Sequence, residues 1–197
     1  MRTSREETAR NREKILGIAG RLFRERGLDG VSLAEIMATA ELTHGGFYRH
    51  FPSKEALAAE ACARVAEGTD ANWCNARDAA AEDALRALID RYLTPEHRES
   101  AATGCIYAAL GCEVGRSTDD ALHQIFADGL QGLVNVLSEV GPEAHAEDRR
   151  SAAIGRLSSL AGALILARAT KGTPLSDEIL SAARSWLEAS VQPEQNR

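Results

Sequence analysis

Apolar residues recur every three or four positions along most of the chain, which predicts a protein built from helices. The first such stripe is Ile15, Ile18, Ala19, Leu22 and Phe23. It indicates an amphipathic helix from Arg5 to Arg26, ended by a glycine. Strand-forming residues are sparse and the five prolines lie outside the periodic segments. The expected fold is therefore all-α.

Two short helices are expected after this first one. Ser32 with Glu35 three residues later is the pattern of a capping box, which opens a helix from Leu33 to Ala40. Thr43 is in the position to cap a second helix from His44 to His50. Two short helices joined by a three-residue turn and packed on a longer helix predict an N-terminal helix-turn-helix head.

Longer helical segments fill the rest of the chain. A fourth helix is expected from Lys54 to about Ala80, and it would link the head to a helical body. The body helices are expected at Ala81 to Leu93, Gly104 to Gly115, Thr118 to Glu139, Ala146 to Lys171 and Ser176 to Val191. This predicts a DNA-binding domain over residues 1–53 and a ligand-binding and dimerisation domain over 54–197.

The charge distribution supports a head that faces DNA. Residues 1–54 hold ten Lys and Arg against seven Asp and Glu, a net charge of +3, so the whole-chain charge of -6 leaves -9 on the remainder. Five basic side chains near the start of the first helix either lie along phosphates or form a solvated face: Arg2, Arg5, Arg10, Arg12 and Lys14.

The run SLAEIMATAELTHGGFYRHFPSKEAL, from Ser32 to Leu57, resembles the DNA-binding head of the TetR family of repressors. The features that carry the resemblance are Tyr48, the pair His50-Phe51, and the pair Ser53-Lys54 that opens the next helix. The resemblance implies double-stranded operator DNA as the partner, and it implies phosphate or groove contacts by Thr43, Tyr48, His50 and Lys54.

A recognition helix enters the major groove N-terminus first, so its early exposed residues face the base edges. The DNA-binding residues expected here are Ser32, Thr43, His44, Gly45, Gly46, Tyr48, Arg49, His50 and Lys54. Glycine is a poor helix former, so the presence of the glycine pair needs an explanation. Either the backbone approaches DNA closely there, or the first turn of the helix is frayed. Arg49 reaches either phosphate or solvent.

Glu41 departs from the family, which has glycine in the turn before the recognition helix. A residue other than glycine there must adopt an unfavourable backbone conformation or remodel the turn. Its carboxylate should also weaken DNA binding slightly unless it pairs with an arginine.

The last two helices predict a homodimer, because one short recognition helix covers too few bases for specificity. One side of the first carries Ile154, Leu157, Leu160, Ala161, Leu164, Ile165 and Arg168, and the second carries Ile179, Ala182, Ala183, Trp186 and Leu187. An intramolecular core is the alternative, but the resemblance implies a four-helix dimer interface.

The middle helices would hold a small-molecule effector. The candidate ligand residues are Trp73, Tyr92, Cys105, Tyr107, Glu113 and Phe126, and for each apolar one a place in the plain core is the alternative. Glu113 and Arg116 either orient a polar ligand or pair with each other. Cys105 lies at an expected helix N-terminus, whose dipole favours a reactive thiolate, and a buried inert cysteine is the alternative.

Other function classes find little support. No C-x-x-C or H-E-x-x-H motif, phosphate loop or nucleophile elbow occurs, so we expect no metal, no cofactor and no enzyme activity. An enzyme that uses Cys105 with His97 or His123 is the alternative, as is a helical adaptor that binds only protein. The charged start and the lack of an apolar stretch of roughly 20 residues predict a cytoplasmic protein without a membrane segment.

Overall fold

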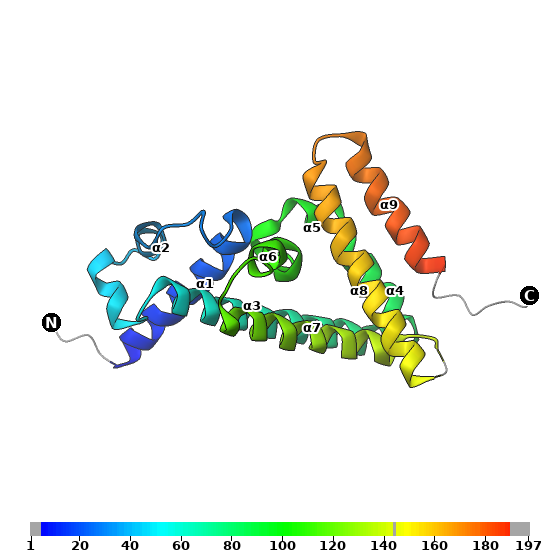
Figure 1. Cartoon of the computed structure of the whole chain (residues 1–197), viewed down its shortest axis with the longest axis horizontal. Helices are drawn as coiled ribbons and strands as arrows, with labels where there is room; N and C mark the ends of the chain where they lie inside the picture. Colours follow the sequence, from blue (N-terminus) through cyan, green and yellow to red (C-terminus); the bar gives the residue numbers. More distant parts are fainter. Residues whose placement is uncertain (1–4, 144, 190–197) are drawn as a thin grey trace, which may run out of the picture. The chain divides into compact units, whose positions relative to one another are not determined.

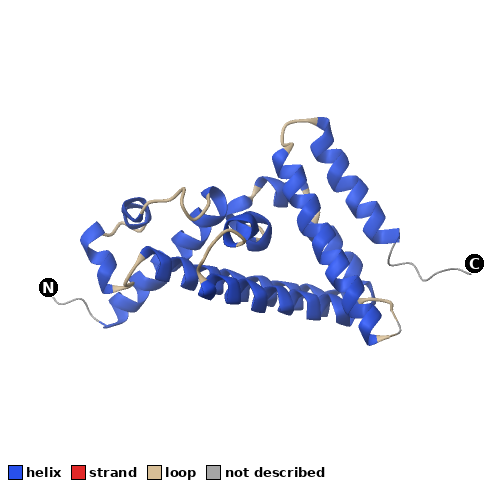
Figure 2. Cartoon of the chain, in the orientation of Figure 1, coloured by secondary structure: helices blue, strands red, loops and turns tan. Residues whose placement is uncertain are grey.

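The computed structural model describes residues 5–143 and 145–189, and within them it contains helices and loops but no strand (Figures 1 and 2). The all-α prediction is confirmed. The elements are α1 Arg5–Arg26, α2 Leu33–Thr39, η1 His44–Arg49, α3 Lys54–Ala80, η2 Ala81–Asp83, α4 Ala84–Tyr92, α5 Pro95–Glu99, η3 Ala101–Thr103, α6 Ile106–Val114, α7 Asp120–Val140, α8 Ala146–Ala169 and α9 Pro174–Ala189. The elements labelled η are 3₁₀ helices.

Helix α5 was not predicted from the sequence, because Pro95 reads as a break between helices. In the structure Pro95 occupies the first turn of α5, where a proline costs no hydrogen bond. The Thr94 hydroxyl accepts a hydrogen bond from the backbone N–H of His97 at 3.0 Å and so caps the helix. The helix expected from Ala81 begins only at Ala84, after the short η2, and residues 190–191 of the last predicted helix lie outside the described part of the chain.

The chain forms two compact units, neither of which is continuous in sequence. The first takes in the described residues up to Glu67 together with Ala101–Phe126, and the second takes in Gly68–Ser100 and the described residues from Ala127 onward. Helix α6 therefore belongs to the same unit as the helix-turn-helix. The functional division at residue 53 stays a prediction.

The first unit is built around α1. This helix buries Ile15, Leu16, Ala19, Leu22 and Phe23, and it packs against α2, η3 and α6. The Ser32 hydroxyl accepts a hydrogen bond from Glu35 N–H at 3.2 Å, which confirms Ser32 as the N-cap of α2. The Glu35 carboxylate forms an ion pair with Arg26 at 2.6 Å, so its side chain also ties α2 to the end of α1.

In the second unit α8 and α9 lie side by side (Figure 1). On α8 the Arg156 guanidinium is 4% exposed and forms a two-armed ion pair with Glu143, in which the Nη1–Oε2 distance is 3.2 Å. Burial disfavours ionisation of Glu143, but hydrogen bonding and attraction to Arg156 outweigh it, so the pKa of this carboxyl is lowered. The ion pair thus compensates a buried charge.

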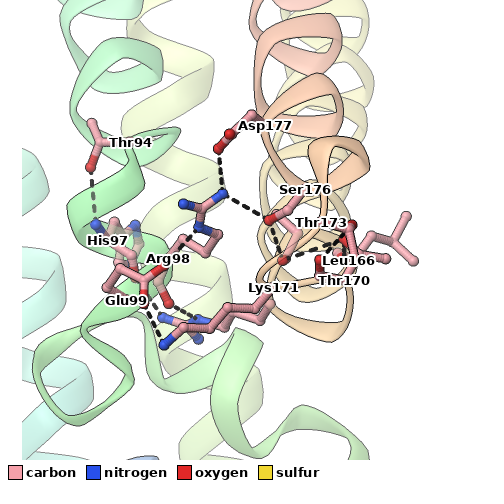
Figure 3. Close-up of polar contacts among 12 residues, drawn as sticks. Thr94, His97, Arg98, Glu99, Leu166, Thr170, Lys171, Thr173, Ser176 and Asp177 are labelled. Atoms are coloured by element: carbon pink, nitrogen blue, oxygen red, sulfur yellow. Dashed lines mark hydrogen bonds and ion pairs between the residues drawn. The ribbon is translucent and has the colours of Figure 1, made fainter.

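Polar side chains bind α5 to the α8–α9 hairpin (Figure 3). Arg168 donates hydrogen bonds to the carbonyls of His97 at 2.9 Å and Arg98 at 3.2 Å, which would otherwise be unsatisfied at the end of α5. Arg98 reaches the fully buried Ser176 hydroxyl at 2.8 Å and Asp177 at 2.6 Å. The five-residue helix α5 is therefore held by hydrogen bonds to both α8 and α9.

The apolar face expected on α8 is divided in the structure, which corrects the predicted dimer face. Leu157, Leu160 and Leu164 are buried within the chain, and Arg168 holds α5. The large apolar side chains that stay exposed on these two helices are Ile154, Ile165, Leu166, Leu175 and Trp186. Gly155 and Gly162 have open space beside them on α8.

Helix α8 also corrects the expectation that no segment is long and apolar enough to span a bilayer. An 18-residue window within Ala146–Ala169 has a mean hydropathy of 1.3, which is sufficient by length and composition alone. Core helices of soluble proteins share this length and composition, and α8 buries seven residues, among them Ala153, Leu160 and Ala167.

Candidate nucleic-acid interface

The candidate recognition element is η1, a six-residue 3₁₀ helix held in place by two aromatic anchors. Phe47 and Phe51 are 0% and 1% exposed, and their rings stack at 5.8 Å between centroids. Between them Tyr48 is 65% exposed, with only an edge contact to Phe47 at 5.2 Å. One side of η1 is therefore fixed in the core, and the other presents a large amphipathic side chain to solvent.

The exposed side of η1 carries most of the expected base-facing residues. Thr43, His44, Gly45, Tyr48 and Arg49 are all exposed, while Gly46 and His50 are half-buried. Thr43 is the N-cap residue of η1, but its hydroxyl makes no capping hydrogen bond, which corrects that part of the prediction. Thr43 is thus an exposed residue at the start of η1 without a capping role for its hydroxyl.

Neither glycine of the pair is required by the fold itself. A Cβ at Gly45 would meet nothing within 4 Å, and one at Gly46 would make ordinary contacts with Thr43 and Met37. Both residues also have a backbone conformation open to other amino acids, since Gly27 and Gly172 are the described glycines with positive φ. The fold therefore gives no internal reason for glycine at position 45.

The turn before η1 has the strained residue expected from the sequence. Glu41 has a φ of +58°, which glycine adopts without cost and other residues do not. Lys14 Nζ donates to its carboxylate at 2.8 Å, and this hydrogen bond lowers the pKa of Glu41. The carboxylate is paired, with a lysine and not with an arginine.

The basic residues of α1 are largely engaged within the head. The Arg12 guanidinium lies 4.6 Å from the centre of the Phe51 ring and pairs with Glu60. Arg10 lies 3.8 Å from Glu6, and Lys14 pairs with Glu41. Arg2 is outside the described residues. Of the five basic residues considered, at least Arg12 has a structural role beside the recognition helix.

A small polar cleft of about 250 Å³ opens between α1 and η1. Its walls are Glu7, Thr8, Asn11, Met37, Leu42, Thr43, Gly46, Arg49 and His50. His50 lines it with a lowered pKa, first because of burial and then because of repulsion from Arg12 and Arg49. Its Nδ1 is buried without a hydrogen-bond partner in the described structure. The cleft thus brings four of the expected DNA-binding residues together.

Thr8 and Asn11 were missed from the sequence, although they lie on the α1 side of this cleft. They are one helical turn apart, so the spacing of polar residues before the apolar stripe is the signal that would have found them. Lys54, in contrast, lies at a separate cleft of about 450 Å³ with Leu28, Glu113 and Arg116. Ser53 caps α3 there by accepting from Ala56 N–H at 3.1 Å.

The expected ligand residues fall into two groups, one in each unit. In the first unit the Tyr107 and Phe126 rings meet edge-to-face at 5.3 Å, and Cys105 is 5% exposed at the N-cap of α6. In the second unit Trp73 meets Tyr92 at 5.9 Å. Glu113, which lies in the first unit, accepts a hydrogen bond from the backbone N–H of Leu28 at 2.7 Å.

The histidines proposed as partners of a catalytic cysteine are used locally. His97 lies 2.7 Å from the carbonyl of Tyr92, and His123 lies 2.9 Å from that of Ser117. Burial lowers the pKa of His97. The hydrogen bond to the Tyr92 carbonyl opposes this shift, and repulsion from Arg168 and Arg91 adds to it. Within the described residues, no group of three His, Cys, Asp or Glu side chains could hold a metal ion.

Comparison with known proteins agrees with this geometry. The model of bacterial regulatory proteins of the TetR family matches residues 15–61, which contain the whole helix-turn-helix. The helix-turn-helix head therefore matches the TetR family, which supports a TetR/AcrR-type regulator. The match is confined to these residues of the head.

Among TetR-family relatives, the transcriptional repressor NemR of Escherichia coli K12 is 28% identical over 136 residues, 65% of this chain and 65% of NemR. The regulator AcrR of Shigella flexneri is 39% identical over 59 residues, 30% of this chain and 27% of AcrR. The chain thus spans less than two thirds of the length of the curated relatives it matches.

Solved structures show the same fold beyond the head. The reduced form of E. coli NemR superposes with a TM-score of 0.80 at 20% identity, over 95% of this chain and 100% of that one. A TetR-family regulator from Cytophaga hutchinsonii gives 0.79 at 21% identity, over 96% and 98%. At these identities the likeness establishes the TetR fold.

Proposed function

We propose that this protein is a cytoplasmic transcriptional repressor that binds a palindromic operator as a homodimer and is released by a small-molecule or electrophilic effector. The observation that carries the proposal is the exposed side of η1, where Thr43, Gly45 and Tyr48 face solvent over a rigid aromatic anchor. This is the geometry that a recognition helix needs in the major groove.

Some of the DNA contacts would position the protein on the phosphates, and others would read the base edges. Thr43, Arg49, His50 and Lys54 would hold phosphates, with Thr8 and Asn11 on the opposite wall of the small cleft. His44, Gly45 and Tyr48 would face base edges, with Gly46 behind them and Ser32 capping α2. NemR, AcrR and the family model supply the expectation that the contact is with DNA.

The dimer would form through α8 and α9. Their exposed apolar side chains, with Leu166 at 57% and Trp186 at 61% exposure, are a surface that water-exposed monomers rarely keep. Gly155 and Gly162 leave room for a second helix to approach α8 closely. A two-fold dimer would set the recognition helices on half-sites about 34 Å or a multiple of it apart.

The effector is proposed to act on the helical body, residues 54–197, through one of two aromatic groups: Tyr107 with Phe126 in the first unit, or Trp73 with Tyr92 in the second. Cys105 is the proposed site for an electrophile, with an inert core cysteine as the alternative. It is buried at the start of α6, so attack on its thiol would require opening of this segment.

Selection of bound duplexes from a random DNA pool tests the proposal. We expect enrichment of a short palindrome whose binding weakens steeply with salt, because phosphate contacts release counterions. The Tyr48→Ala variant should lose the enrichment, while a variant at the exposed Glu25 on α1, Glu25→Ala, should keep it. Binding that shows neither sequence enrichment nor salt dependence would contradict the proposed function.

A further inference from the structure

The two ends of α6 are each hydrogen-bonded to the end of α1 or the turn that follows it. Arg24 Nη1 donates to the carbonyl of Gly104 at 2.9 Å, immediately before α6 begins. Near the other end of α6, the Glu113 carboxylate accepts from Leu28 N–H at 2.7 Å. We define these two hydrogen bonds as the α6 latch.

The Arg24 side chain is held in the orientation that its hydrogen bond to Gly104 requires. Its Nε donates to the Gly20 carbonyl of its own helix at 3.0 Å, which aims the remaining guanidinium nitrogens away from α1. The side chain is half-buried, and burial lowers the pKa of the guanidinium. A planar guanidinium with one edge held and the other on a carbonyl has little freedom to move.

The turn after α1 is shaped around Glu113. Gly27 ends α1 with a φ of +83°, and a Cβ there would collide with the Glu113 carboxylate. The same carboxylate takes the next backbone N–H, that of Leu28, which leads through Val31 to the Ser32 cap of α2. Glu113 therefore fixes the segment that sets the start of the first helix of the helix-turn-helix.

We propose that Arg24 and Glu113 are positioning residues for operator binding, because they fasten both ends of α6 to the segment that leads into α2. This assigns Glu113 to the DNA-binding machinery and not to ligand contact. It follows that α6 and the helix-turn-helix respond to operator as one body. A structural change at Cys105, beside Gly104, would alter the hydrogen bond from Arg24 and so shift the end of α1. The inference rests on the proposed function, since it needs an operator.

Hydrogen exchange with and without saturating operator duplex tests the α6 latch without any effector. In the wild-type protein we expect operator to slow exchange in η1 and also in residues 104–114, the latter by about fivefold or more. In the double variant Arg24→Gln/Glu113→Ala, operator should still slow exchange in η1 but leave residues 104–114 unchanged. A purely structural loss would lower thermal stability without removing that coupling.

Two further variants keep the test decisive. Glu113→Gln retains an acceptor oxygen for Leu28 N–H and should retain the protection of α6. The control Arg21→Gln/Glu25→Ala changes exposed residues on the same helix and should behave as wild type. Operator protection of η1 without any change in residues 104–114 of the wild-type protein, or full protection of α6 in the double variant, would overturn the inference. Absence of protection in η1 itself would overturn the proposed function as well.

Discussion

Lys14 on α1 and Glu41 in the turn before η1 are joined by a 2.8 Å hydrogen bond, across 27 residues of sequence. This hydrogen bond engages the Glu41 carboxylate, while the Glu41 backbone has a φ of +58°, a conformation that favours glycine. A favourable side-chain contact and an unfavourable backbone conformation therefore meet at one residue.

Replacing Glu41→Gly should raise the thermal midpoint by a few degrees. Glycine adopts the positive φ without a Cβ clash, and the ion pair that is lost is exposed and weak. Glu41→Gln keeps the strain but loses the charge, so it should not raise the midpoint. Calorimetry measures both, and a lower midpoint for Glu41→Gly would mean that the Lys14 contact outweighs the strain.

Gly45→Ala should stabilise the fold but weaken operator binding. Alanine gains about 0.5–1 kcal/mol over glycine in helical backbone, and a Cβ at this position meets nothing within the protein. On DNA the added methyl would occupy the space of close approach, so we expect the operator Kd to rise about tenfold or more. Gly17→Ala, at an equally open and exposed position of α1, should gain stability with unchanged affinity. Unchanged affinity of Gly45→Ala would favour the frayed-turn explanation.

Charge on the exposed apolar side chains of α8 and α9 should separate the dimer. Leu166→Glu combined with Trp186→Glu places two carboxylates where we propose a buried interface. Sedimentation velocity should then show the 21.1 kDa chain instead of twice this mass. Ser181→Glu adds the same charge at another exposed position of α9 and should leave the dimer intact. A wild-type protein that sediments as a monomer would refute the dimer.

The cysteines should differ widely in alkylation by N-ethylmaleimide. Burial raises the pKa of Cys62 to about 12 despite the nearby Arg24, so at pH 8 its thiolate is about 1000-fold scarcer than that of an ordinary cysteine. Cys112 is exposed and should react first. Peptide mass spectrometry over time measures the order, with a sample in denaturant as the control in which all four react. Early alkylation of Cys62 in the native protein would contradict its burial.

Glu143→Ala should be among the most destabilising single changes in the second unit, at about 3 kcal/mol, because it leaves the buried Arg156 charge without its partner. The pKa of Glu143 is lower in the folded than in the unfolded chain. Its contribution is therefore present above the unfolded value of about 4.3 and is lost as pH falls through the folded value.

Urea unfolding at pH 7 and at pH 3 measures this dependence. The difference in free energy of unfolding between wild type and Glu143→Gln should shrink at the lower pH. Glu139→Ala, which removes a more exposed partner of Arg77, should cost much less at pH 7. Equal losses in free energy of unfolding for Glu143→Ala and Glu139→Ala at pH 7 would argue against the burial of the Arg156 charge as the cause.

The sequence predicted what local signals determine. Arg5–Arg26 and Lys54–Ala80 begin and end as expected, because Gly27 and Ser53 mark helix ends within a few residues. Glu113 shows the limit of such reasoning. Its neighbour Arg116 offered a local partner, but its carboxylate binds Leu28, 85 residues away. No periodicity or spacing encodes a contact of that range.

Because the first compact unit joins the described residues up to Glu67 with Ala101–Phe126, its head is not a module that ends where the family match ends, at residue 61. A chimera that takes a relative's first sixty residues would set a foreign turn against the native Glu113 and Gly104. The transferable part is discontinuous. Exchange of DNA specificity between relatives would succeed more often when the α6 segment is transplanted with the head.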